Sequence, residues 1–306
     1  MRSCYRLDGG KASECDAADA RIVLYNEPTA EDEKELMEQY GIDQHTLLSA
    51  LDPDELSRLE FEENHAAIIF KKPKSYRADD NFLLRVSSCG IFVYADRLVV
   101  VLSDDSPLFE GRVPFQINNL QDVILRLIYQ AILHFEGHLK AISMLSDSLE
   151  KRISASLENR YLLNMFALEK SLVFILNSIG TNAGLFERMK RTANRLSFDE
   201  DHLAILDDIA IENKQCYRRA EIYSQVISGL MDARVSIVGN NLNHLIKKFT
   251  IVTIAIMLAN FVVSLFSMNV RMPFPAEEHL WPFYVISLLA FGSFFGCLVL
   301  WRVKRW

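Results

Sequence analysis

The chain has 306 residues, of which 50% are hydrophobic and 24% are charged, and its formal net charge is −7. This balance is too apolar for a disordered chain and too charged for one that lies wholly in lipid, so we expect a soluble part and a membrane part. The negative charge, without an aromatic and basic patch, argues against nucleic acid as a partner. The five cysteines are scattered and odd in number, which is typical of a reduced, cytosolic set rather than a disulfide framework.

Strand-length runs alternate with helical patterns in the first part of the chain. Residues 31–40 and 43–51 predict helices. The apolar or β-branched runs that predict strands are 22–25, 66–70, 82–86, 91–94 and 98–102. Residues 1–19 are polar and charged, so we expect no cleavable signal peptide. Residues 1–115 therefore predict an α/β or α+β domain.

Long helical patterns replace the strands after Pro114. They cover residues 120–157 and 158–194. The run Ser197-Phe-Asp-Glu200 then fits a capping box, in which the serine hydroxyl accepts a hydrogen bond from the N3 amide and the glutamate reaches back to the cap. This run predicts the start of a third helix.

The third helix has no proline before Pro273, so we expect it to continue through the first apolar segment. At 1.5 Å per residue it would be roughly 100 Å long. Apolar residues recur on one of its faces at Ile222, Val226, Leu230, Ala233 and Ile237. One small domain cannot bury such a helix. Residues 116–246 therefore predict a helical bundle and a stalk, and either the bundle or an oligomer must bury this helix.

Two uncharged segments lie at about 249–270 and 281–301, within a membrane part that we place at 247–306. An α-helix needs about 20 apolar residues to cross a hydrocarbon core of about 30 Å, and each segment is long enough. The alternative is a pair of buried core helices, which the length rule disfavours. We therefore expect a transmembrane hairpin in contact with lipid.

Charges flank the two segments unequally. The cations beside them are Lys247, Lys248, Arg302, Lys304 and Arg305. The connecting loop carries Glu277 and Glu278, which either attract cations to the outer mouth or keep an exposed loop soluble. The positive-inside rule predicts a multi-pass protein of the cell membrane with both termini in the cytoplasm. The α/β domain is then cytoplasmic.

Polar residues in the first segment share one helical face, which we call the polar seam. Steps of three and four pass through Asn243, Ile246, Thr250, Thr253, Met257, Asn260, Ser264 and Ser267. Six of these eight are polar, and polar groups in a bilayer must find partners or water. One explanation is packing of helix against helix. The other is a pore wall, shared by several copies, whose neutral oxygens receive a hydrated cation between apolar constrictions at Ile246 and Met257.

Several runs in the chain form a recognisable set. They are Leu59-Glu-Phe-Glu-Glu-Asn64, Ser228-Gly-Leu-Met-Asp232, Asn243-His-Leu-Ile-Lys-Lys-Phe-Thr250, Phe266-Ser-Met-Asn-Val270, Met272-Pro273 and Trp301-Arg-Val-Lys-Arg-Trp306. Together they resemble the CorA family of divalent metal transporters. The resemblance implies a funnel-shaped homopentamer with an N-terminal α/β domain, a stalk helix that continues into a pore-lining span, and an outer ring of second spans.

The resemblance also implies roles for single residues. Asn269 would hold the hydrated ion at the outer mouth, in a selectivity motif with Ser267 and Met268. The residues that would line or constrict the pore are Asn243, Ile246, Phe249, Met257 and Asn260. Asp208 falls where the family places an acidic sensor of intracellular metal.

Three positions depart from the family pattern. Ser267 stands where the signature has glycine, and Leu258 where the family often has proline. Serine adds a hydroxyl and removes the backbone freedom of glycine. The position that matches the partner of the sensor carboxylate is Ser49, and Asp52, Asp54 and Glu55 lie nearby as possible substitutes.

Carboxylates gather near the start of the third helix at Asp207, Asp208 and Glu212. Hard cations such as Mg²⁺ take carboxylate oxygens, often through water. These three, with Asp52 and Asp54, are the candidate regulatory metal site. The alternative is a solvated face, which better explains the acidic residues at 199–201 because acids favour a helix N-terminus.

His134 and His138 are four residues apart on a predicted helix, a spacing that can bind a transition metal. An ordinary exposed helix face explains them better, because no third ligand is near in the sequence. The sequence contains no phosphate-binding loop, dinucleotide fingerprint, nucleophile elbow or zinc-binding cluster. We expect no enzyme and no catalytic cofactor.

These observations predict channel-like transport of hydrated divalent cations, first Mg²⁺ and then Co²⁺ or Ni²⁺, gated by intracellular metal. Mg²⁺ would be both substrate and regulator. One alternative is a Zn²⁺ transporter of the ZntB type, a group that also relaxes the first signature residue. The other is a non-conducting membrane metal sensor or scaffold.

Overall fold

The structure is a computed structural model that divides into two compact units, Met1–Met231 and Asp232–Trp306. The residues that it describes are 2–8, 11–74, 83–104, 113–155, 159–268 and 280–304. Each unit is described by itself below.

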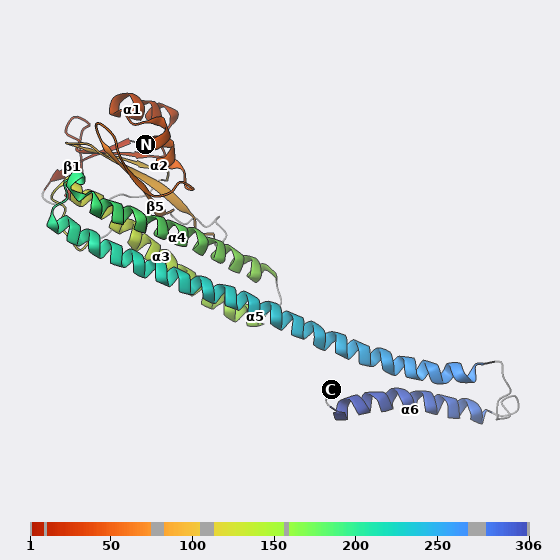
Figure 1. Ribbon diagram of the computed structural model, residues 1–306. Coiled ribbons are helices and arrows are strands. Elements are labelled where there is room, and N and C mark those ends of the chain that lie inside the picture. The colour runs from red at the N-terminus through yellow and green to blue at the C-terminus, as the bar shows by residue number, and fades with distance from the viewer. Residues whose placement is uncertain are drawn as a thin grey trace. The chain divides into compact units, whose positions relative to one another are not determined.

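The N-terminal unit contains a mixed sheet with the strand order β2-β1-β3-β7-β6-β5-β4 (Figure 1). Its strands are β1 (Arg2–Asp8), β2 (Lys11–Glu14), β3 (Ile22–Asn26), β4 (Arg58–Phe61), β5 (Ala66–Pro73), β6 (Val86–Val93) and β7 (Leu98–Leu102). The central pair, β3 and β7, is parallel, and the other neighbours are antiparallel. All of β5 and β7 is buried, as expected for strands covered on both faces.

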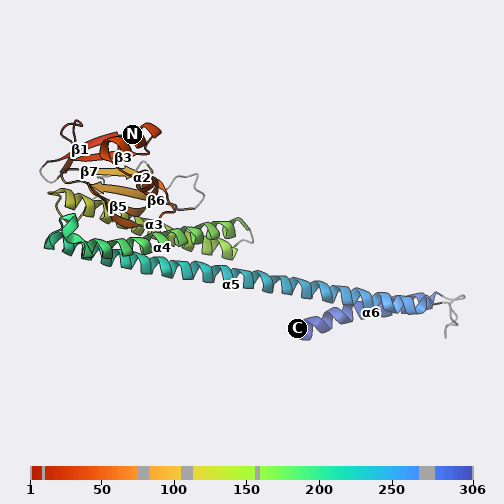
Figure 2. The same ribbon diagram turned by 45° about the horizontal axis from the view of Figure 1, so that its top comes forward.

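Helices cover the two faces of this sheet (Figure 2). Alternate residues of β7 point to opposite sides: Val99 and Val101 pack with α1 (Ala30–Tyr40) and α2 (Gln44–Leu51), whereas Val100 packs with the long helices. The long helices are α3 (Leu120–Ala155), α4 (Asn159–Arg191) and the first part of α5 (Glu200–Phe266).

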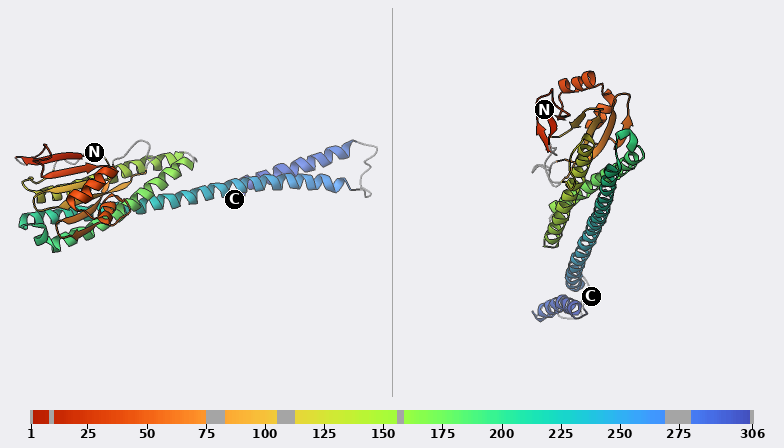
Figure 3. Two further views of the ribbon diagram at one scale, coloured as in Figure 1. Left: turned by 90° about the horizontal axis from the view of Figure 1, so that it is seen from above. Right: turned by 90° about the vertical axis from the view of Figure 1, so that its left-hand side faces the viewer.

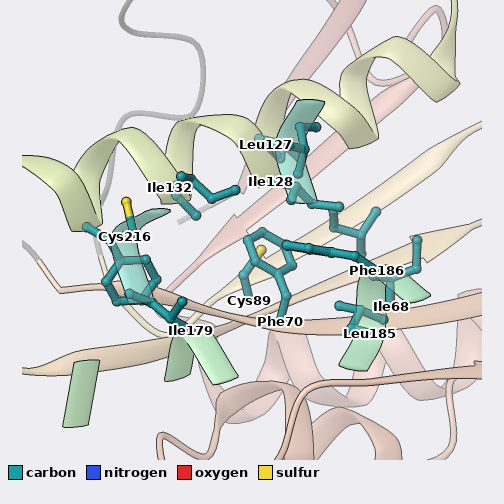
Figure 4. Packing of buried hydrophobic residues seen from close by; sticks show 14 of the residues in the cluster. Ile68, Phe70, Cys89, Leu127, Ile128, Ile132, Ile179, Leu185, Phe186 and Cys216 are labelled. Atoms are coloured by element: carbon teal, nitrogen blue, oxygen red, sulfur yellow. The ribbon is translucent and has the colours of Figure 1, made fainter. Parts of the chain in front are cut away.

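The larger core lies between the sheet and these long helices. Phe70 and Cys89 from the sheet pack among Leu127, Ile128 and Phe186 from α3 and α4 (Figure 4). All five side chains are buried, and the core continues into α5 through residues such as Leu206 and Ile209. The N-terminal unit is therefore an α/β domain joined to a three-helix layer by a continuous apolar core, which confirms the predicted fold class for this part.

Most predicted elements match, but the two strands predicted at 82–86 and 91–94 are wrong and three strands were missed. Residues 83–85 lie outside any strand, and one strand, β6, replaces the two predicted at 82–86 and 91–94. The strands β1, β2 and β4 were not predicted, because their runs are rich in polar residues; β2 and β4 are the edge strands, and β1 lies beside β2. Long-range pairing with β3 and β5 stabilises these polar runs as strands.

The predicted capping box at Ser197 is also wrong. Ser197 has a φ of 57° and ends a short 3₁₀ helix, Ala193–Leu196, instead of starting α5. Asp199 caps α5 two residues later: its Oδ1 accepts from the His202 amide at 2.9 Å, and its own amide donates to His202 Nδ1 at 3.2 Å. A reciprocal cap therefore exists, with histidine in the place of the expected glutamate.

The C-terminal unit contains the remainder of α5 and a second helix, α6 (Trp281–Lys304), which lie side by side (Figure 3). In the described part of the chain, three helical stretches are long and apolar enough to cross a membrane: Tyr161–Arg191, α5 and α6. The apolar window of the first is 39% buried within its own unit, against 6% for the other two. The first is therefore a core helix, and the two C-terminal helices are the ones whose apolar surface needs lipid or other partners.

Candidate functional site: the polar seam and the acidic residues

One face of α5 packs against α6. Its half-buried or buried residues recur at steps of three and four, and they are Ile251, Ala255, Ala259, Val262 and Phe266. Ala255 is completely buried, so this face of α5 is covered at that residue. Small residues such as alanine are typical of helix contacts in a membrane.

The polar seam lies on the opposite face of α5. Thr253 and Met257 are each two positions from Ala255, which is about 200° around an α-helix with 3.6 residues per turn. Thr250, Thr253, Met257, Asn260 and Ser264 are all exposed. The seam therefore does not form the packing contact between α5 and α6 of one chain.

The seam threonines make hydrogen bonds within α5. Thr250 Oγ1 donates to the Ile246 carbonyl at 2.8 Å, and Thr253 Oγ1 donates to the Phe249 carbonyl at 2.9 Å. Each hydroxyl proton is thus used, while the oxygen lone pairs stay free to accept. The seam therefore presents acceptor oxygens outward, which suits the water shell of a cation.

The end of the seam is described only in part. Ser267 follows the last residue of α5, and its Oγ donates to the Ser264 carbonyl at 3.0 Å. Met268 is exposed. Asn269, Glu277 and Glu278, for which we predicted roles at the outer mouth, lie outside the described residues.

The part of α5 in which the seam begins is exposed along its whole length. Every residue from 235 to 250 is exposed, including the predicted pore residues Asn243 and Ile246. Phe249 is 70% exposed. Apolar residues on several faces of a helix in this stretch need burial that a single chain does not provide.

The predicted acidic residues of α5 differ in their surroundings. Asp207 forms an ion pair with Lys190 of α4. Asp208 is exposed, and Glu212 is half-buried. Burial, followed by the charges of Glu212, Glu136 and Asp208, raises the pKa of Tyr129. Asp208 and Glu212 therefore share a negative field near one tyrosine.

The other predicted carboxylates, Asp52 and Asp54, follow the end of α2 and surround a lysine that the sequence reasoning missed. Lys71 of β5 is 1% exposed, and its Nζ donates to the Asp52 carbonyl at 3.2 Å, the Pro53 carbonyl at 2.7 Å and Ser88 Oγ at 2.8 Å. Asp52 Oδ1 accepts from the Asp54 amide at 2.8 Å. A fixed ammonium thus already sits beside these carboxylates.

Within the described ranges, no three His, Cys, Asp or Glu side chains lie close enough together to hold a metal ion. Asp52 and Asp54 therefore do not form a site with Asp207, Asp208 and Glu212 inside one chain.

Lys71 gives a pH-dependent prediction. Burial lowers its pKa to about 8 from 10.5, although Asp52, Asp54 and Glu55 oppose this shift. Between these two pH values the unfolded chain binds more protons at this position than the folded chain, so Lys71 makes stability rise with pH. In Lys71→Met this contribution is absent, and the stability of the unaltered protein relative to the variant should rise by up to about 3 kcal/mol from pH 8 to 10.5. Thermal melting of both proteins in detergent measures it; parallel pH profiles would contradict the assignment.

The two histidines of α3 are not on an exposed face, and that expectation was wrong. His138 is buried and His134 is half-buried, with ring centroids 4.6 Å apart. Burial, and then the neighbouring His134, lowers the pKa of His138 to about 4. Both rings are therefore uncharged packing residues at neutral pH.

A buried network that was not predicted joins the starts of α3 and α5. His202 is buried, and its Nε2 lies 3.2 Å from Asp122 Oδ1 while its Nδ1 lies 2.6 Å from Asp199 Oδ1. Asp122 in turn accepts from the amides of Asn118 and Asn119. The spacing of Asp199 and His202 was the available signal, since an acceptor three residues ahead of a donor marks a helix start.

Comparison with known proteins identifies the family of this chain. A family model described as a CorA-like Mg²⁺ transporter protein matches residues 18–305. The chain belongs to the CorA-like Mg²⁺ transporter family. A curated relative, the cobalt/magnesium transport protein CorA of Methanocaldococcus jannaschii, is 22% identical over 277 aligned residues, and the match covers 85% of this chain and 83% of the relative. The CorA-like chain is accordingly a transporter rather than an enzyme.

Solved structures share the fold of this CorA-like chain. The complete CorA magnesium transporter from Methanocaldococcus jannaschii matches 99% of this chain and 97% of its own, with a TM-score of 0.81 and 18% identity. The full-length CmaX protein matches the same shares with a TM-score of 0.72 and 16% identity. The ZntB cytoplasmic domain from Vibrio parahaemolyticus matches 78% of this chain and 98% of its own, with a TM-score of 0.60 and 11% identity. ZntB is therefore the weaker fit.

Proposed function

We propose that several copies of this chain, five in the arrangement that the family resemblance implies, enclose an axial pore for hydrated divalent cations. The observation that carries the proposal is the position of the polar seam. It faces away from α6 and is exposed, so in a membrane it needs partners that only other chains or a water-filled path provide.

Symmetry turns one seam into a pore wall. In a cyclic assembly each seam residue becomes a ring around the axis. Thr250, Thr253, Asn260 and Ser264 then give rings of neutral oxygen that accept from the water shell of an ion. Asn243 would add a further polar ring, and Ile246, Phe249 and Met257 would form apolar constrictions that close by losing water.

Mg²⁺ is the proposed ion, followed by Co²⁺ and Ni²⁺. Mg²⁺ loses its bound water reluctantly, so it suits a wall that contacts its hydration shell. Ser267, Met268 and Asn269 are the proposed outer selectivity motif, with Glu277 and Glu278 attracting cations to it. Both termini would then be cytoplasmic, and an inside-negative potential of 100 mV would add about 4.6 kcal/mol of driving force per divalent ion.

We propose that binding of intracellular metal closes the pore. Asp208 and Glu212 would face a neighbouring chain, where Mg²⁺ between carboxylates holds the stalks together. Asp52, Asp54 and Asp207 each lie near a lysine in their own chain, so we propose that they contribute less to metal binding than Asp208 and Glu212. Loss of the metal leaves like charges that repel, and the stalks separate.

Ion flux tests the proposal. Purified protein in liposomes should take up Mg²⁺ when a potassium gradient sets the inside negative, and uptake should rise with the potential. Empty liposomes are the control. If none of the ions Mg²⁺, Co²⁺, Ni²⁺ and Zn²⁺ enters, the chain is a non-conducting sensor. If Zn²⁺ alone enters, the chain is a transporter of the ZntB type. A monomer or dimer by mass in detergent would contradict the axial pore.

A further inference from the structure

A cavity of about 240 Å³ opens between α5 and α6, on the packing side of the hairpin and away from the polar seam. It is lined by Ile251, Ile254, Cys297, Leu300, Trp301 and Lys304. Its wall is apolar apart from the thiol, the indole N–H and the Lys304 ammonium. The cavity therefore suits a hydrocarbon chain with an anion at one end.

Both helices place a lysine at the same end of this cavity. Lys304 lines it directly from α6. On α5, Lys247 lies four residues before Ile251 and seven before Ile254, so it continues the cavity-lining face by one turn. Trp301 lies one turn before Lys304, and tryptophan is enriched at the level of lipid headgroups.

The hairpin itself supplies no acidic side chain at this end. No Asp or Glu occurs in residues 233–276 or 279–306, whereas Lys247, Lys248 and Arg302 accompany Lys304. A second copy of the hairpin has the same sequence, so it brings no Asp or Glu that could neutralise these cations. The matching anion must come from another molecule, and the phosphate of a membrane lipid lies at this depth.

We infer that the cavity binds an acyl chain of an anionic phospholipid, with Lys304 and Lys247 on its phosphate. Long lysine side chains can bury their methylenes against Leu300 and Trp301 and still reach the headgroup. Basic pockets between membrane helices on the cytoplasmic side recognise lipids in this way. The site is distinct from the pore, because the cavity and the polar seam are on different faces of α5.

Native mass spectrometry of the full chain in detergent tests this inference. Phosphatidylglycerol should stay bound at lipid concentrations where phosphatidylcholine with the same acyl chains is lost. Lys304→Gln should weaken phosphatidylglycerol binding at least fivefold, and Lys247→Gln should weaken it in the same direction. Arg302→Gln is the matched control: it removes the same charge two residues away on another face of α6, and binding should change less than twofold.

A second variant tests the cavity instead of the charge. Cys297→Phe should fill it and weaken phosphatidylglycerol binding while all cations remain. The site would be overturned if the two lipids bound equally. It would also be overturned if Lys304→Gln and Arg302→Gln had equal effects on binding, or if Cys297→Phe had none. A cross-link between Cys297 and an introduced Ile254→Cys of a second copy would overturn it too, because a neighbouring chain would then occupy the cavity. Lipid binding is measured without flux, so failure here leaves the pore proposal untouched, and failure of flux leaves this one untouched.

Discussion

Replacing Asn260 with leucine should lower Mg²⁺ uptake into liposomes at least tenfold. The two side chains have similar size, so the substitution removes the amide from the polar seam while the helix keeps its shape. In a cyclic assembly every copy loses its oxygen at the same level of the pore, and the ion loses acceptors for its water shell. A tenfold fall corresponds to a barrier raised by about 1.4 kcal/mol.

Ser293→Ala is the matched control for this prediction. Ser293 is also a polar residue of the hairpin, but it lies on α6, and its Oγ donates to the Ala290 carbonyl at 2.8 Å. Its loss should leave uptake within twofold of the unaltered protein. Full uptake by Asn260→Leu, or an equal loss in both variants, would mean that the seam does not line the ion path.

The second large effect should follow Asp208→Asn. If Mg²⁺ between neighbouring chains holds the pore closed, removal of this carboxylate weakens the metal site in every copy. The Mg²⁺ concentration needed on the inner side to stop uptake should rise at least tenfold. Uptake at low inner Mg²⁺ should stay unchanged, because Asp208 is in the N-terminal unit and not in the seam.

Asp207→Asn provides the comparison, since it changes the adjacent residue by the same charge. The Asp207 carboxylate already pairs with Lys190, so it is partly neutralised before any metal binds. We expect its loss to shift the inhibitory Mg²⁺ concentration less than threefold. Equal shifts in the two variants would indicate a general field effect, and no shift in Asp208→Asn would contradict the sensor role.

Secondary structure was predictable wherever a pattern was local and strong. The helices at 31–40 and 43–51 and the strand at 98–102 match α1, α2 and β7 to within one residue at each end. Predictions failed for the polar runs of β1 and β4, which pair with β3 and β5, and also at the start of α5. Ser197 has the side chain of a cap, yet the chain turns at that residue and Asp199 takes the capping role.

The candidate site was likewise predictable only where the pattern is local. Helical periodicity was enough to group Thr253, Met257 and Asn260 on one face, because residues three and four apart are neighbours on any α-helix. It could not say which face α6 would cover. That depends on contacts between segments far apart in the chain, which place Ala255 against α6 and leave the seam outside.

Charged residues show most clearly the difference between what the sequence determines and what the tertiary structure decides. The sequence by itself determined a membrane hairpin, its basic flanks and its seam, because segment length, hydropathy and helical period are local properties. Only the tertiary structure decided which charges are already paired: Lys190 reaches Asp207 from another helix, and Lys71 is buried beside Asp52 from a distant strand. Burial and ion pairing depend on spatial neighbours, and the order of residues along the chain does not contain them directly.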